Sequence, residues 1–328
     1  MSDEEDALTT IENTLTIASK NDPAKILNVL SGFYFKQQDY HQAIEIKKQW
    51  SASGKKDFNE WLKFANNLRE EKAYNFATDA YEFILSYKLN SKITGKALLG
   101  LAQTFEDQIT STNKSNLIPY FFDQNIFFED PFGIYTPISS ENLKTSLSIY
   151  DSLLTSPNTS PIIAEAYFRL GEIQYKILQD FDQAYYLLNK ALNSRPKKVL
   201  KSKITLRIAD VLIATGQKQE AISFLKKEMK TNPSSDIILK NLLVQFLTND
   251  PGLTLKKVDS CFFELNPTEP SFNDLMELKT FLTKYYDDSE IEKFAFTYFQ
   301  KSESYLRQKK LGNAIEELEY LIKKFPDA

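Results

Sequence analysis

Few side chains in this sequence are of a type that supports chemistry. The 328-residue chain contains one histidine, His41, and one cysteine, Cys261. A single cysteine excludes an intramolecular disulfide and a zinc site built from several cysteines. A single histidine excludes multi-histidine metal sites and leaves little for nucleophilic catalysis assisted by histidine. We expect His41 to lie in a turn and face solvent, and Cys261 to act as a small core hydrophobe.

The short motifs that hold phosphates or metals are also missing. The sequence contains no GxGxxG, no GxxxxGK[ST], no HExxH and no calcium-binding loop of the DxDxDG type. No constellation of nucleophile, base and oxyanion donor can be assembled from the remaining residues. The sequence therefore predicts a protein that is not an enzyme and that uses no cofactor and no metal.

Composition narrows the function further. The chain has 44 acidic and 40 basic residues, a formal net charge of −4, and the basic residues are spread along it. This pattern gives no footprint for nucleic acid. No apolar stretch approaches the roughly 18–20 residues that span a bilayer. The acidic start, MSDEEDALTTIENT, lacks the basic and apolar regions of a signal peptide. The sequence thus predicts a cytoplasmic protein as encoded, or a periplasmic or envelope-associated one if a leader was removed.

The glycine content indicates mostly helix. Only 9 glycines occur in 328 residues, against roughly 7% in average proteins. Because glycine supplies the positive φ angles of tight turns, we expect few such turns and no many-stranded β-sandwich.

Apolar and small residues recur with a period near 34 residues. The clearest segment runs from Ala164 to Pro196, where apolar residues three to four apart predict two amphipathic helices joined near Gln179–Asp182. Small residues at Gly171, Ala184 and Ala191 would let the two backbones approach closely. The same frame recurs in the segments Ala24–Asp57, Phe58–Ser91, Ser202–Ser235, Asp236–Glu269 and Ala295–Ala328.

This pattern resembles the tetratricopeptide repeat family, whose repeat is a 34-residue helix–turn–helix with the pattern W-x2-L-G-x2-Y…A-x3-F…P. The segment Ala164–Pro196 differs by one extra residue in its turn. The resemblance implies an all-α protein, a right-handed α-solenoid of about six to seven repeats. The alternative is an irregular helical bundle. The predicted division is an N-terminal capping segment (1–23), two repeats and the first helix of a third (24–104), an insertion (105–140), the second helix of the third repeat with repeats four to six (141–269), and an additional helix with a C-terminal repeat (270–328).

The insertion is unusually aromatic. Its aromatic residues are Tyr120, Phe121, Phe122, Phe127, Phe128, Phe132 and Tyr135. A solvated loop would not carry so much apolar area, because each buried Phe contributes roughly 1.5–3 kcal/mol. These rings either pack on the chain's own repeats or form a docking patch for another protein, since aromatics are enriched at interface hot spots.

The resemblance also implies a concave groove lined by the first helices of the repeats. The side chains at the groove positions are Lys63, Asn66, Arg69, Arg169, Glu172, Tyr175, Lys203, Arg207, Asp210, Lys240 and Asn241. Long donors on adjacent repeats suit an extended peptide, whose carbonyls and acidic side chains accept hydrogen bonds. The alternative is that these are ordinary helix residues paired with one another.

Some members of the family hold a C-terminal carboxylate with a three-element clamp. Lys203 and Arg207 match the Lys-x3-Arg element. However, Arg169 stands where the preceding repeat should offer Asn, and the earlier Lys-x3-Asn pair is missing. One element of three is too little to predict a clamp.

The functional prediction is a non-enzymatic scaffold that binds a protein or peptide in the groove. A structural subunit of a larger, cell-envelope assembly, docked through the insertion and the solenoid edges, is the alternative. The sequence identifies neither the partner nor the oligomeric state.

Overall fold

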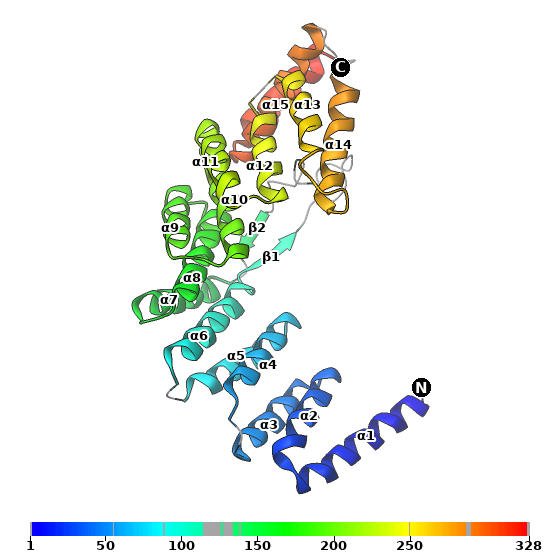
Figure 1. The fold of residues 1–328 in the computed structure, drawn as a ribbon, viewed down its shortest axis with the longest axis vertical. Coiled ribbons are helices and arrows are strands. Elements are labelled where there is room, and N and C mark those ends of the chain that lie inside the picture. The colour runs from blue at the N-terminus through cyan, green and yellow to red at the C-terminus, as the bar shows by residue number, and fades with distance from the viewer. Residues whose placement is uncertain are drawn as a thin grey trace. The chain divides into compact units, whose positions relative to one another are not determined.

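Sixteen α-helices make up most of the part of the chain that the structure describes (Figure 1). The computed structural model describes residues 2–54, 56–87, 89–113, 125, 127, 134–137, 139–248, 250–286 and 290–326. The chain divides into two units, each with its own core. Unit 1 comprises Met1–Ile109 and Ile138–Ile162, and unit 2 comprises Thr110–Pro137 and Ile163–Ala328.

Unit 1 is a series of helical hairpins. Its helices are α1 (Ser2–Asn21), α2 (Pro23–Lys36), α3 (Tyr40–Ala52), α4 (Phe58–Glu70), α5 (Tyr74–Leu85), α6 (Ser91–Glu106) and α7 (Ser140–Thr155), followed by the start of α8 (Ser160–Ile173). The core lies between neighbouring hairpins, around the fully buried side chains of Trp61, Tyr81 and Ile84. His41 is the second residue of α3 and is exposed, so it lies in a helix and not in the turn that we expected.

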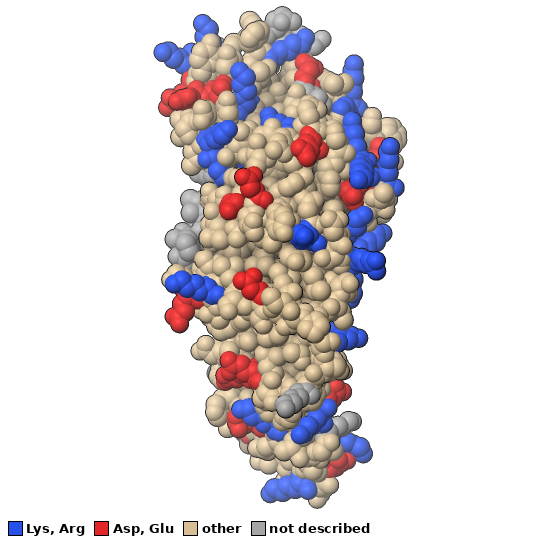
Figure 2. Space-filling view, turned by 90° about the vertical axis from the view of Figure 1, so that its left-hand side faces the viewer, with Lys and Arg blue, Asp and Glu red and all other residues tan. Residues whose placement is uncertain are grey.

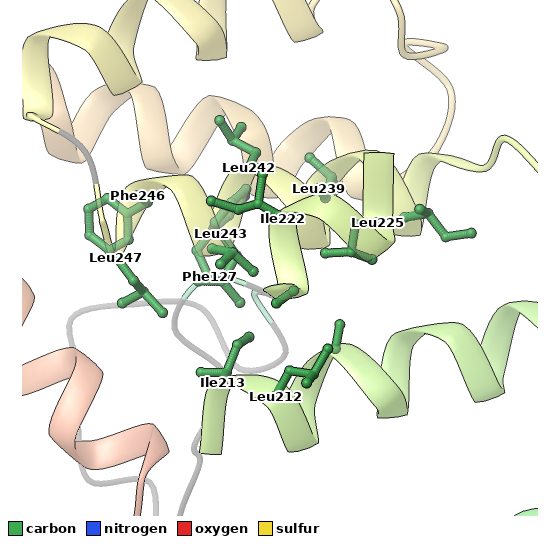
Figure 3. Close-up of a cluster of buried hydrophobic side chains, with 14 of the residues drawn as sticks. Phe127, Leu212, Ile213, Ile222, Leu225, Leu239, Leu242, Leu243, Phe246 and Leu247 are labelled. Atoms are coloured by element: carbon green, nitrogen blue, oxygen red, sulfur yellow. The ribbon is translucent and has the colours of Figure 1, made fainter. Parts of the chain in front are cut away.

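Unit 2 continues the helical hairpins and adds a short β-ribbon. Its helices after α8 are the π-helix η1 (Gln174–Leu178), α9 (Phe181–Asn193), α10 (Lys198–Ala214), α11 (Lys218–Thr231), α12 (Ser235–Phe246), α13 (Pro251–Cys261), α14 (Pro270–Tyr285), α15 (Glu290–Arg307) and α16 (Leu311–Lys324). Strands β1 (Thr110–Asn113) and β2 (Ile134–Pro137) pair antiparallel, with Thr110 opposite Pro137. The core of this unit gathers side chains of α10, α11 and α12 (Figure 3).

Side-chain caps define where many helices begin. Asp22, Asp39, Asp57, Asn90, Ser139, Asp180, Ser234 and Asp250 each accept a hydrogen bond from a backbone N–H of the helix that follows. Such a cap satisfies one of the unpaired N–H groups of the first turn and contributes about 1 kcal/mol. These capping residues are local sequence signals that mark where the helices of the repeats begin.

Five hairpins have turns of the same type, and these turns are tight although the chain contains few glycines. One or two residues after the first helix, a residue adopts a positive φ, and the N–H of the next residue bonds back to that helix. These turn residues are Gln38, Lys72, Gln179, Gly216 and Lys309. In four of them the N–H bonds to the carbonyl five residues earlier, for example Ala73 to Leu68 at 2.9 Å. The expectation of few tight turns was wrong, because non-glycine residues accept the left-handed conformation here.

The fifth turn contains the extra residue noticed in the sequence. Asp180 donates to the carbonyl of Gln174, six residues earlier, at 3.0 Å. The additional residue is absorbed by the π-helix η1, which widens the end of the first helix. Close packing between α8 and α9 then requires a small residue, since a Cβ at Gly171 would lie 2.8 Å from Leu188 Cγ.

Candidate partner-binding face

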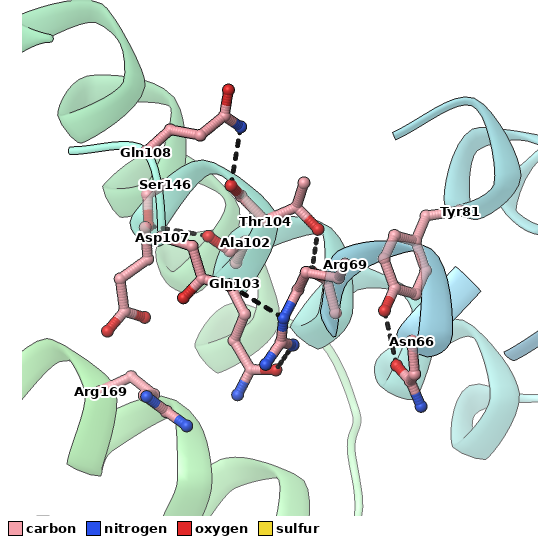
Figure 4. Close-up of polar contacts among 12 residues, drawn as sticks. Asn66, Arg69, Tyr81, Ala102, Gln103, Thr104, Asp107, Gln108, Ser146 and Arg169 are labelled. Carbon is pink, nitrogen blue, oxygen red and sulfur yellow. Dashed lines mark hydrogen bonds and ion pairs between the residues drawn. The ribbon is translucent and has the colours of Figure 1, made fainter. Parts of the chain in front are cut away.

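Three of the predicted groove residues lie on α4 in unit 1. Lys63 and Asn66 are exposed, and Arg69 is half-buried. Arg69 pairs with Asp107 at 3.0 Å and also donates to the side chain of Gln103 at the end of α6 (Figure 4). The guanidinium of Arg69 therefore bridges two successive hairpins.

Asn66 of α4 also has a polar contact, which is with Tyr81 of α5. Burial raises the pKa of its phenol to about 12, so the hydroxyl stays protonated at neutral pH. It donates to Asn66 Oδ1 at 2.5 Å (Figure 4). Gly100 of α6 permits this arrangement, because a Cβ at that position would clash with the ring of Tyr81.

In unit 2 the predicted groove residues of α8, η1, α10 and α12 form one network. Arg207 donates to both carboxylate oxygens of Glu172 and, through Nη1, to Asp210 Oδ2 at 2.9 Å. Lys240 Nζ donates to the other oxygen of Asp210 at 2.9 Å. The guanidinium also lies over the ring of Tyr175, 4.7 Å from its centroid. Three consecutive first helices are thus connected through two residues of α10, Arg207 toward α8 and Asp210 toward α12.

Burial and charge set the protonation of this network. Burial opposes ionisation of Asp210, but Lys240 and Arg207 outweigh it and lower the pKa of its carboxyl. Glu172 is likewise buried, and Arg207 and Lys176 lower its pKa. Burial would lower the pKa of Arg207, yet the two carboxylates raise it. Burial, followed by the charge of Asp210, raises the pKa of Tyr175. Glu172, Asp210 and Arg207 therefore stay ionised at neutral pH.

The remaining groove residues differ in their surroundings. Arg169 pairs with Glu165 one turn earlier on α8, at 3.1 Å. Lys203 is exposed at the start of α10. Asn241 of α12 is buried, and its Oδ1 has no hydrogen-bond partner. Lys203 and Lys63 are therefore the cations of this set that face solvent.

Most of the predicted insertion patch lies outside the described residues, namely Tyr120, Phe121, Phe122, Phe128 and Phe132. The backbone of Tyr135 belongs to β2. Phe127 is fully buried in the core of unit 2, among side chains of α10 and α12 (Figure 3). At this position the aromatic side chain packs on the chain's own helices.

Sequence reasoning missed four residues around Phe127. The carbonyl of Phe127 accepts a hydrogen bond from Arg307 Nη2 at 2.6 Å, and Arg307 in turn pairs with Glu303 at 2.5 Å. Asn125 donates to the side chain of Glu277 on α14. The only signal in the sequence was Glu303 and Arg307 at the spacing of one helical turn, which is common on helix surfaces.

Other chemistry finds little support among the described residues. They contain no group of three or more His, Cys, Asp or Glu side chains that could hold a metal ion. Cys261 ends α13 and packs against the core, and burial raises the pKa of its thiol to about 11. None of the described helices is long and apolar enough to cross a membrane. Figure 2 shows a face whose centre is largely uncharged, with basic side chains along its right-hand edge.

Stacked helical hairpins with a shared turn define this chain as a helical-repeat protein. The family model described as "Tetratricopeptide repeat" matches residues 165–198 and 297–328. The chain thus contains tetratricopeptide repeats at these two places, as the sequence predicts, and the predicted all-α fold class is confirmed. Proteins of this family generally act as non-enzymatic scaffolds for protein–protein interaction. The number of repeats and the insertion stay predictions.

Comparison with curated protein sequences gives no match. Among solved structures, the chain is similar to the TPR domain of P58(IPK), with 11% sequence identity over 97% of this chain and 89% of that chain. The TM-score of 0.25 is too low to support any conclusion from this likeness.

Proposed function

We propose that the protein captures a peptide or helix of a partner on the inner face of its repeats. In unit 2 this face is formed by the Arg207 network of α8, η1, α10 and α12, together with Lys203. In unit 1 it is formed by Lys63, Asn66 and Arg69 of α4.

The observation that carries this proposal is the continuity of the Arg207 network across three first helices. Glu172, Asp210 and Tyr175 hold the guanidinium in one place. A surface whose side chains are already fixed loses little conformational entropy on binding. Less of the interaction energy is then needed to offset that loss, so the affinity is higher. Lys203 of α10 and Lys63 of α4 are exposed, and each ammonium group offers three donors. Acceptor groups of a partner, above all carboxylates and backbone carbonyls, fit these donors.

The test uses the exposed lysines, because a change at Arg207 would leave buried carboxylates unpaired and would report on folding. Lys203→Glu and Lys63→Glu are made separately in tagged protein and used to capture partners from native lysate, followed by mass spectrometry. Lys226→Glu on α11, also exposed, is the matched control. We expect Lys203→Glu to reduce the captured partner severalfold while the control does not. Equal capture by all variants would reject the inner face.

A second candidate function is a structural subunit that docks through its edges. It is favoured by apolar side chains on the outer side of α16, where Leu311, Ile315 and Ile322 are 49%, 54% and 67% exposed. Exposed apolar side chains gathered on one helix mark interaction sites. If this edge docks into an assembly, Ile315→Glu with Ile322→Glu should shift the native complex to lower mass in size-exclusion chromatography. An unchanged complex would exclude this edge.

A further inference from the structure

Asn125 and Phe127, which lie between β1 and β2, make both polar and apolar contacts within unit 2. Phe127 is fully buried, and Asn125 is only 2% exposed. The ring of Phe127 lies in the hydrophobic cluster with Ile213 of α10 and Leu243 of α12 (Figure 3). The site therefore has an apolar slot that fits one aromatic side chain.

The polar contacts around that ring are equally specific. Phe127 N–H donates to Asn125 Oδ1 at 2.9 Å, which forms a local Asx turn. Asn125 Nδ2 donates to the carbonyl of Asp274 at 3.4 Å and to Glu277 Oε2 at 2.5 Å. Arg307 reaches the carbonyl of Phe127 from α15. Two helices, α14 and α15, thus make polar contacts with an asparagine that lies two positions before a phenylalanine.

The chemistry of the slot distinguishes asparagine from its closest relative. An aspartate at this position would lose the amide donors and bring its carboxylate against that of Glu277. Like charges at this distance repel, and a buried carboxylate without a donor is costly. The slot accordingly selects Asn over Asp.

The slot lies close to the face that the proposed function uses. Arg307 is near enough to Asp210 to contribute to the lowered pKa of that carboxyl. Ile213 follows Arg207 and Asp210 on the same helix, α10. The slot and the Arg207 network therefore share α10, which contributes Ile213 to one and Arg207 and Asp210 to the other.

We propose that unit 2 contains a binding slot for partner segments with the pattern Asn-x-Phe, which the chain's own Asn125 and Phe127 occupy as an internal competitor. The proposal rests on the proposed function, because it names the chemistry of a segment captured on this side of the repeats. One buried phenylalanine and a few hydrogen bonds are interactions that a short partner segment can replace. A tethered occupant acts at an effective concentration on the order of millimolar, so it suppresses weak competitors.

The experiment measures binding of a fluorescent peptide with the sequence FDQNIFFED, residues 122–130 of this chain, by fluorescence anisotropy. Wild-type protein is compared with the double variant Asn125→Ala, Phe127→Ala, in which the slot is vacated. Control peptides carry Asp in place of the asparagine or Ala in place of the first phenylalanine after it. Circular dichroism reports whether the variant is folded.

We expect the vacated variant to bind the peptide at least tenfold more tightly than the wild type, and each control peptide to bind the variant at least tenfold more weakly. Equal binding to wild type and variant, or equal binding of the three peptides, would overturn the proposal. Unfolding of the variant would also overturn it, since the two residues would then be indispensable core. Lys203→Glu in the vacated variant should leave peptide binding unchanged, so failure of the inner-face proposal remains a separate result.

Discussion

Lys47 is a buried amine on α3, and its surroundings disfavour its charge. It is 4% exposed, donates to Asn28 and lies over the rings of Trp50 and Phe64. Burial lowers the pKa of Lys47 to about 8, while Glu60 and Asp57 act in the opposite direction. The aromatic rings offset part of the cost of holding a cation here.

This lowered pKa predicts a dependence of stability on pH. Between pH 8 and 10.5 the unfolded chain holds more protons on this amine than the folded chain, so the free energy of unfolding rises with pH in that window. Lys47→Met should remove this rise and stabilise the protein at pH 7 by about 1–2 kcal/mol. Urea denaturation at pH 7 and pH 9.5 measures both effects, with Lys48→Met, at a side chain that is 40% exposed, as the control. A variant that keeps the slope would contradict the assignment.

Arg207 is the residue whose loss should cost most. Without its guanidinium, Glu172 and Asp210 keep buried charges with fewer partners. Breaking such a network by removing one member costs roughly 3–5 kcal/mol, so we expect Arg207→Met to lower the free energy of unfolding by about 3 kcal/mol. Lys203→Met, on the same helix but exposed, should change it by less than about 0.5 kcal/mol. Chemical denaturation followed by circular dichroism compares the two, and similar values would show that the network is dispensable.

At the scale of elements, the shared turn is the feature that relates the hairpins. Lys72 occupies its left-handed position with φ 60°, which an L-side chain adopts at a cost of roughly 1–2 kcal/mol. Gly216 occupies the same position after α10. The turn geometry, more than the glycine itself, is what the repeats have in common.

The turn predicts an effect opposite to the usual one for glycine in a helical protein. Lys72→Gly should raise the free energy of unfolding by about 0.5–1 kcal/mol, because relief of the left-handed strain exceeds the entropy of the freer unfolded chain. Gly216→Ala should lower it by a similar amount. Thermal denaturation of both variants checks the signs. A loss of stability in Lys72→Gly would mean that its side chain makes a contribution larger than the strain.

Helical elements and their order could be predicted because their signals are local. Apolar periodicity, capping residues such as Asp39 and Asp57, and small residues such as Gly171 act within one hairpin. Within unit 2, four of the predicted groove residues contact one another, namely Glu172, Arg207, Asp210 and Lys240. That Arg207 would be held by Glu172 and Asp210 was foreseen only as the general alternative of mutual pairing. The contact of Arg307 with Phe127 joins residues 180 positions apart, and no periodic pattern encodes such a pair.

At the scale of the whole molecule, two hydrophobic cores support two units. The chain has two tryptophans, Trp50 and Trp61, and both lie in the core of unit 1. Neither core cluster shares a residue with the other. In repeat proteins stability is a sum of local and neighbour terms, so each unit has its own stability.

This arrangement predicts that different probes see different unfolding transitions. Tryptophan fluorescence should report unit 1 alone, whereas far-ultraviolet circular dichroism reports the helices of both units. In urea the two curves should not coincide, and Phe127→Ala should shift the dichroism curve without moving the fluorescence midpoint. Coincident curves that shift together would show instead that the molecule unfolds as one cooperative body.

The chain order of the slot and its occupant has a consequence for biosynthesis. Asn125 and Phe127 leave the ribosome after α6, long before α10, α12, α14 and finally Arg307 of α15 have been made. At a translation rate of roughly 5–20 residues per second, the ribosome needs on the order of ten seconds after Phe127 to synthesise the helices that form the slot. In that interval this aromatic segment is an exposed hydrophobic sequence, so the nascent chain has a defined period in which a chaperone or a premature partner can engage it.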